Sequence, residues 1–189
     1  MVRVVLVGEI GSGKTYISKQ FGYPVFNADA VVSQIYKTNR TFFNLIKKKI
    51  PNSFSSFPLK KEELIKSILI DQINLKKISN IVHPIVRREM NNFIRKNKSK
   101  KIIVLDVPLF LENKLNKKND VIIFIDPKKN ELIKRLKKRK NYNELLIKSF
   151  RELQMPIQIK KNKSDFIIKN NYLKSNIKQS IKKIIKKLV

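Results

Sequence analysis

Hydrophobic residues along this chain follow two patterns that alternate from the N-terminus onward. Five short apolar runs, rich in Val and Ile, lie at 4–7, 25–26, 102–105, 121–125 and 166–168. Between most of them, apolar residues recur at spacings of three and four, which predicts amphipathic helices. Because uniformly apolar runs suit strands buried on both faces, the alternation predicts an α/β fold with a parallel, doubly wound sheet of about five strands.

The region after the second run interrupts this alternation. Residues 41–98 contain no convincing strand, and apolar residues recur there at helical spacing, as at Phe42, Leu45 and Ile46. The region is too long for one crossover helix, so we expect a helical insertion at about 38–98, with loops around 51–58. Pro84 is expected to open a new helix within it. The core would then comprise about 1–37 and 99–189 of a single domain covering 1–189.

The first apolar run leads directly into the segment GEIGSGKT at residues 8–15. This segment matches the P-loop pattern G-x-x-x-x-G-K-[ST] between a predicted strand and a predicted helix, the context that the motif requires. In such a loop the glycines let successive N–H groups point at a phosphate, and the following helix adds its positive end. Lysine at this position reaches the β and γ phosphates, and the threonine hydroxyl suits the magnesium ion that bridges them. The predicted nucleoside triphosphate site comprises Gly8, Gly11, Ser12, Gly13, Lys14 and Thr15.

Two carboxylates directly follow predicted strands. Asp29 lies just after the second strand, near the start of a helix, at the edge of an open α/β sheet where ligands bind. Asp106 ends the third strand, as a Walker B carboxylate does when it lies near magnesium. A strand that ends in Asp is equally typical of a helix cap, so both interpretations of Asp106 stay open.

Two basic features stand apart from the general charge of the chain. His83, the single histidine, directly precedes Pro84; taken alone, a capping or core histidine is the more ordinary interpretation than a ligand. Six of the seven residues at 134–140 are basic, and Arg135 and Arg139 are four residues apart, hence on one face of a helix. This cluster suits a lid at about 135–155 that clamps triphosphate charge, although a solvated helix face explains it equally well.

Composition limits the remaining possibilities. There are 43 Lys and Arg against 14 Asp and Glu, a formal net charge of +29. The lysines occur with abundant Asn and Ile over nearly the whole length, which favours solvated lysine faces and no specific nucleic-acid partner, with nonspecific binding at low salt. The chain has no cysteine, which excludes disulfides and thiolate metal sites. The apolar N-terminal run is too short for a membrane span, so we expect a cytoplasmic protein without a membrane partner, as a monomer or small homo-oligomer.

Several separated segments, in this order and spacing, resemble the dephospho-coenzyme A kinase family over nearly the whole chain. They are the P-loop at 8–15, Asn27-Ala28-Asp29, His83-Pro84 with Arg87, DVPLFLE at 106–112, Arg135-Leu136 with Arg139, Gln154-Met155-Pro156 with Lys160, and SDFIIKN at 164–170. The resemblance implies a P-loop kinase with a helical substrate-domain insertion and a lid. It also implies transfer of the γ-phosphoryl group of ATP, with Mg²⁺, to the ribose 3′-hydroxyl of dephospho-coenzyme A, which gives ADP and coenzyme A.

The same resemblance implies roles for individual residues. Asp29 matches the family's base, Lys14 and Arg139 complete the catalytic set, and Arg139 would face the nucleotide from the lid. His83 and Arg87 match positions on the acceptor side, which favours a ligand role for His83 over a core role. Thr15 and Asp106 would hold the metal. The nucleotide-binding set extends to Tyr16, through its backbone N–H, and to Asn170.

Three positions depart from the family pattern. Glu9 replaces a usual glycine beside the phosphate loop, Asn27 replaces a first aspartate, and Tyr16 replaces a small hydroxyl residue. Because none of these changes touches Lys14 or Asp29, the resemblance implies altered tuning of the activity rather than its loss. Competing hypotheses are a P-loop kinase for another small molecule, a basic nucleic-acid-binding ATPase, and a P-loop protein that binds nucleotide as a scaffold.

Overall fold

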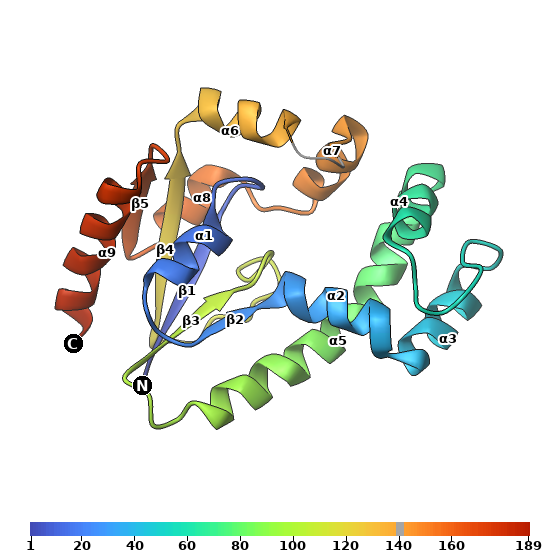
Figure 1. Ribbon diagram of the computed structural model, residues 1–189, viewed down its shortest axis with the longest axis horizontal. Helices are drawn as coiled ribbons and strands as arrows, with labels where there is room; N and C mark the ends of the chain where they lie inside the picture. The colour runs from blue at the N-terminus through green and yellow to red at the C-terminus, as the bar shows by residue number, and fades with distance from the viewer. Residues whose placement is uncertain (139–141) are drawn as a thin grey trace. The chain divides into compact units, whose positions relative to one another are not determined.

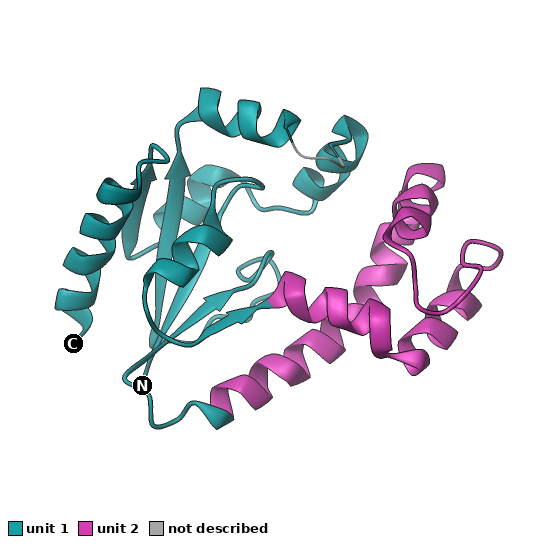
Figure 2. Cartoon of the chain, in the orientation of Figure 1, with its two compact units in different colours: residues 1–27, 96–189 teal, residues 28–95 magenta. Residues whose placement is uncertain are grey.

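The computed structural model describes residues 1–138 and 142–189 of the chain. These residues form two compact units, coloured separately in Figure 2. Unit 1 comprises residues 1–27 and 96–189, and unit 2 comprises residues 28–95. Within the described residues, no helix combines the length and apolar character needed to cross a membrane.

Unit 1 is built on a five-stranded parallel sheet with the strand order β2-β3-β1-β4-β5 (Figure 1). Its strands are β1 (Val2–Gly8), β2 (Val25–Asn27), β3 (Ile102–Asp106), β4 (Asp120–Pro127) and β5 (Phe166–Asn170). The central strand β1 is paired on both sides, and its residues 3–8 are buried or nearly so, as expected for a uniformly apolar run. The structure thus confirms the predicted parallel α/β sheet, whose strands all end at the same edge.

Five helices are described in unit 1. They are α1 (Lys14–Gln20), α6 (Lys129–Lys137), α7 (Glu144–Glu152), α8 (Ile157–Asn162) and α9 (Lys174–Leu188). Ile17 of α1 and Ile177 and Ile181 of α9 pack in one buried cluster with Val4 and Ile123 of the sheet. The short helix α8 is not evident from the sequence, because six residues are too few to show a helical period.

The regular secondary structure of unit 2 is all helical. It consists of α2 (Ala28–Thr38), α3 (Arg40–Lys49), α4 (Lys61–Ile70) and α5 (Ile73–Lys96). The side chain of Asn39 caps α3 by accepting a hydrogen bond from the N–H of Phe42. Phe42 and Ile46 of α3 are fully buried, and Leu64 and Ile78 contribute to the apolar interior. The helical spacing seen in the sequence therefore corresponds to helices that bury one face.

The expectation that Pro84 opens a new helix was wrong. Helix α5 is continuous from Ile73 to Lys96, with Pro84 inside it. Proline lacks the N–H that would bond to the carbonyl four residues earlier, here that of Asn80. Asn80 is exposed, so water can satisfy that carbonyl, and the buried residues on either side, Val82 and Val86, hold the helix together by packing.

Candidate functional site

At two of its glycines, Gly11 and Gly13, the P-loop passes too close to its neighbours for a Cβ. Gly13 precedes α1 in the left-handed region with φ of 93°, and a Cβ there would lie 2.7 Å from Nδ2 of Asn170. Gly11 has φ of 84°, and its Cβ would lie 2.8 Å from Leu136 and 2.9 Å from Leu132 of α6. Glycine at these positions therefore lets the loop pack against both α6 and the end of β5.

The backbone of the P-loop holds the side chain of Lys14 over the loop. Its Nζ donates hydrogen bonds to the carbonyl oxygens of Gly8, at 3.0 Å, and of Glu9, at 2.7 Å. The N–H of Ser12 closes a turn onto the same Glu9 carbonyl. Ser12 is fully buried, and its N–H is used in this turn, so it shapes the loop from within. Glu9 has a φ outside the left-handed region, so its backbone conformation does not require the glycine usual in the resembling family.

The hydroxyl of Thr15 meets the Walker B-like carboxylate at the edge of the sheet. Thr15 Oγ1 donates a 2.7 Å hydrogen bond to Asp106 Oδ2, and the side-chain amide of Asn27 donates to the same oxygen, also at 2.7 Å. Asn27 and Asp106 are paired residues in the register of β2 and β3. Asp106 is only 2% exposed. The Asp106 carboxylate is thus held at the end of β3, beside the phosphate loop. This position favours the Walker B interpretation over the helix cap.

The segment after β5 supports the other side of the P-loop. Asn170 donates from Nδ2 to the carbonyl of Ser12 at 2.8 Å, and its Oδ1 accepts from the N–H of Tyr172. Tyr172 has a left-handed φ of 64°, and its ring lies under the guanidinium of Arg135, 4.2 Å from the ring centroid. This distance is that of a cation–π contact. Asn170 is therefore a support of the loop backbone in this structure, and Tyr172 contacts an exposed basic residue of α6.

Unit 2 carries Asp29 in the first turn of α2. Asp29 is exposed, and Tyr36, two turns later on the same helix, is partly buried. Burial raises the pKa of the Tyr36 phenol to about 12, and the negative charge of Asp29 contributes to the rise. Tyr36 is therefore a neutral phenol at physiological pH.

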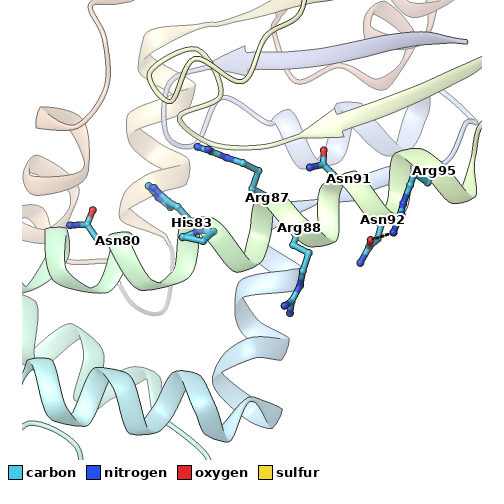
Figure 3. Close-up of a pocket in the computed structure, with 8 residues that line it drawn as sticks. Asn80, His83, Arg87, Arg88, Asn91, Asn92 and Arg95 are labelled. Carbon is cyan, nitrogen blue, oxygen red and sulfur yellow. Dashed lines mark hydrogen bonds between the residues drawn. The ribbon is translucent and has the colours of Figure 1, made fainter.

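A basic hollow of about 710 Å³ lies along α5. Its lining consists of three arginines, three asparagines, His83 and Pro84 from residues 80–95, and no carboxylate belongs to it. Figure 3 shows Arg87 and Asn91 directed to one side of the helix and Arg88 to another. Burial, and then the charge of Arg87, lower the pKa of His83 below its ordinary value. The imidazole is therefore neutral at pH 7, so the positive charge of this hollow comes from arginine.

The structure brings part of the predicted site together. The P-loop residues, Asp106 and Asn170 are connected by hydrogen bonds or close packing in unit 1. Asp29, His83 and Arg87 belong to unit 2. Tyr16 is 45% exposed at the start of α1. Arg139 lies outside the described residues, so its predicted role stays a prediction.

Comparison with known proteins identifies the family of the chain. The family model for dephospho-CoA kinase matches residues 2–176. The chain is 33% identical to the dephospho-CoA kinase of Wolbachia pipientis wMel over 190 residues, covering 98% of this chain and 97% of that protein. It is 32% identical to the dephospho-CoA kinase of Wolbachia sp. subsp. Brugia malayi (strain TRS) over 188 residues, covering 97% of this chain and 96% of that protein. The structure of dephospho-CoA kinase from Campylobacter jejuni has the same fold, with a TM-score of 0.64, 22% identity, and coverage of 98% and 96%. The chain therefore belongs to the dephospho-CoA kinase family, whose reaction, the phosphorylation of dephospho-CoA with ATP, it carries out.

Proposed function

We propose that unit 1 holds the triphosphate of ATP and that unit 2 supplies the groups that bind and orient dephospho-coenzyme A. The observation that carries this proposal is the P-loop itself, in which Lys14, the first turn of α1 and the bonded pair Thr15 and Asp106 meet. The first amide groups of a helix have no carbonyl partner within it, so they suit phosphate oxygens. Lys14 adds a point charge at the β and γ phosphates.

Mg²⁺ is proposed as the metal, held by Thr15 and Asp106. Magnesium prefers oxygen ligands and is usually bound through one or two carboxylates together with substrate phosphates. The hydroxyl and carboxylate, 2.7 Å apart and supported by Asn27, fit this requirement. When bound, the ion neutralises charge that develops on the phosphate oxygens.

The acceptor side is assigned to Asp29, His83 and Arg87. We propose that Asp29 accepts the proton of the ribose 3′-hydroxyl, or orients that hydroxyl when proton transfer is late. The basic hollow on α5 suits an anionic acceptor, because it contains arginines and no carboxylate. Neutral His83 can accept or donate a hydrogen bond there.

We propose a separate function for each part of the chain. We expected a core at about 1–37 and 99–189 and a substrate part at about 38–98, and we propose that these parts are units 1 and 2, with the first boundary at residue 28, so that Asp29 belongs to the substrate part. About 135–155 is proposed as a lid that adds basic residues around the nucleotide. Arg135 contacts Tyr172, and Arg139 is assigned by the family resemblance alone. Because the reaction uses ATP and the chain has no cysteine, we also propose a cytoplasmic location, with ATP and dephospho-coenzyme A as partners.

The test is a transfer assay with ATP, Mg²⁺ and a panel of acceptors that includes dephospho-coenzyme A, nucleoside monophosphates and metabolic alcohols. We expect ADP and coenzyme A to form in equal amounts, and Lys14→Ala to lower kcat/KM by about a thousandfold, because it removes charge from the transferring phosphate. Phosphorylation of another acceptor with dephospho-coenzyme A untouched would contradict the assignment. An unchanged rate in Lys14→Ala would contradict the proposed role of the loop.

A further inference from the structure

Glu112 and Lys160 form a nearly buried ion pair that the proposed reaction does not use. Lys160 Nζ lies 2.7 Å from Glu112 Oε1, and the two side chains are 4% and 12% exposed. Removing an ammonium and a carboxylate from water costs several kcal/mol for each ion, so such a pair is weak evidence for stability. A role in fixing a particular geometry is therefore worth considering for this pair, beside any contribution to stability.

The same carboxylate oxygen also holds the backbone between two helices. Glu112 Oε1 accepts a 3.0 Å hydrogen bond from the N–H of Met155, in the short junction between α7 and α8. The preceding N–H, of Gln154, bonds back to Arg151 of α7, and Pro156 has no N–H. Within the described residues, the bond from Met155 therefore connects this junction to a distant part of the chain.

Both attachments of this contact are fixed in place. Glu112 lies in a turn closed by hydrogen bonds from Asn113 to Leu109 and from Leu115 to Phe110, and Phe110 is fully buried. On the other side, Lys160 belongs to α8.

The chain after α8 is joined to the sheet. The Ser164 hydroxyl donates to the carbonyl of Lys160, and the N–H of Asp165 bonds to Ile122 of β4 at 2.8 Å. The Glu112 carboxylate thus connects the turn after β3 to the start of α8. Helix α7 directly precedes the junction that contains Met155.

We propose that Glu112 is a positioning residue that fixes the C-terminal end of the lid, so that α7 enters the core at one defined place. The proposal rests on the lid assigned above at about 135–155. Because Lys160 and the N–H of Met155 are both donors, one carboxylate oxygen can accept from them together, and the contact with Lys160 keeps that oxygen beside Met155. Fixing one end of a lid lowers the entropy lost when its basic residues order around ATP.

Two double variants separate this role from simple stability. Glu112→Gln with Lys160→Met removes both charges but keeps an oxygen for the N–H of Met155. Glu112→Leu with Lys160→Met removes both charges and that oxygen, with similar side-chain volume. We expect the KM for ATP to be about tenfold higher in the Leu variant than in the Gln variant, with the KM for dephospho-coenzyme A equal in both. Trypsin cleavage after Lys148 or Arg151 of α7 is expected to be about tenfold faster in the Leu variant.

Equal KM values for ATP and equal cleavage rates in the two double variants overturn the proposal. Met155→Pro offers a second route if these variants fail to fold, because it deletes the donor and leaves the ion pair intact. Its matched control, Met155→Ala, keeps the N–H. A rise in the KM for ATP in the Pro variant alone supports the proposal, and the same KM in both variants overturns it.

Lys161→Met controls for the loss of a lysine on α8. Lys161 pairs with Asp126 at 3.2 Å, but both side chains are 36% exposed, so we expect its KM for ATP to stay within about twofold of the wild type. These comparisons use variants that retain transfer activity. Failure of the proposed nucleotide site would appear instead in the Lys14→Ala variant.

Discussion

At the scale of single residues, Asn27 places a neutral amide, and not a second carboxylate, beside Asp106 and Thr15. It donates to the oxygen of Asp106 that also accepts from Thr15, so one negative charge is shared by two donors. Asn27→Asp would place a second carboxylate against the first, and like charges raise the pKa of such a pair.

The Asn27→Asp variant is therefore expected to lose stability as pH rises through the ordinary carboxyl range. In the unfolded chain both carboxyls ionise freely, whereas in the folded protein the pair resists losing its second proton. Denaturant unfolding at pH 7 without Mg²⁺ should show a loss of about 1 kcal/mol, which shrinks at pH 4 and is reversed by Mg²⁺. Asn27→Ala is the control, since its loss of a hydrogen bond should not depend on Mg²⁺. A loss in Asn27→Asp that ignores both pH and Mg²⁺ would contradict this account.

The proposed role of Asp29 is tested by measuring kcat and ATP affinity separately. Asp29→Asn keeps the shape of the side chain but removes the proposed proton acceptor, so kcat should fall by about a hundredfold or more. The dissociation constant for ATP, measured by calorimetry, should stay unchanged, because the substitution leaves the P-loop intact. Wild-type turnover in this variant would show that the base lies elsewhere.

The sequence predicts those site residues whose signal is local. Lys14 and Thr15 lie in one contiguous motif, and Asp106 follows an apolar run. Tyr172 and the contact between Glu112 and Met155 are not predictable in this way. The latter joins groups 43 residues apart, and a lone glutamate after a strand has many ordinary explanations.

At the scale of elements, strands were the most predictable features and helix interruptions the least. All five strands are visible in the sequence as short apolar runs, including the edge strand β5, in which Ile167 is exposed. For the inner strands β1 and β3 the reason is burial on both faces. Pro84 was misleading because a local rule about proline lost to the packing of Val82 and Val86 on both sides of it. Packing of this kind depends on the neighbouring helices of unit 2, which no local pattern reports.

Tyr36 of helix α2 should make the free energy of unfolding of the protein depend on pH in the alkaline range. The folded protein holds the proton of Tyr36 up to a pKa of about 12, while an unfolded tyrosine releases it near 10. The stability contributed by the neutral phenol is therefore complete below pH 10 and lost as pH rises from 10 to 12.

The loss attributable to Tyr36 is expected to reach about 2–3 kcal/mol. Urea unfolding of the wild type and of Tyr36→Phe at a series of pH values measures it, because other titrating groups are common to both proteins. The wild type should lose this extra stability and the Phe variant should not. Parallel stability curves for the two proteins would contradict the assigned pKa.

At the scale of the whole molecule, the net charge of +29 must be distinguished from the charge that serves the reaction. Lysines such as Lys178, Lys182 and Lys186 are exposed on α9, opposite its buried isoleucines, where they keep the helix solvated.

Association of such a surface with a polyanion releases counterions, so the affinity for the polyanion falls steeply as salt rises. We expect the affinity for a random-sequence RNA, measured by fluorescence anisotropy, to fall by at least about a hundredfold between 50 and 200 mM salt. Phosphoryl transfer at 150 mM salt should be the same with and without that RNA, because the groups proposed to take part in the reaction are those of the P-loop and of α2 and α5. Stimulation of ATP turnover by RNA at that salt concentration would instead favour a nucleic-acid-dependent ATPase, and would mean that the basic surface takes part in the reaction.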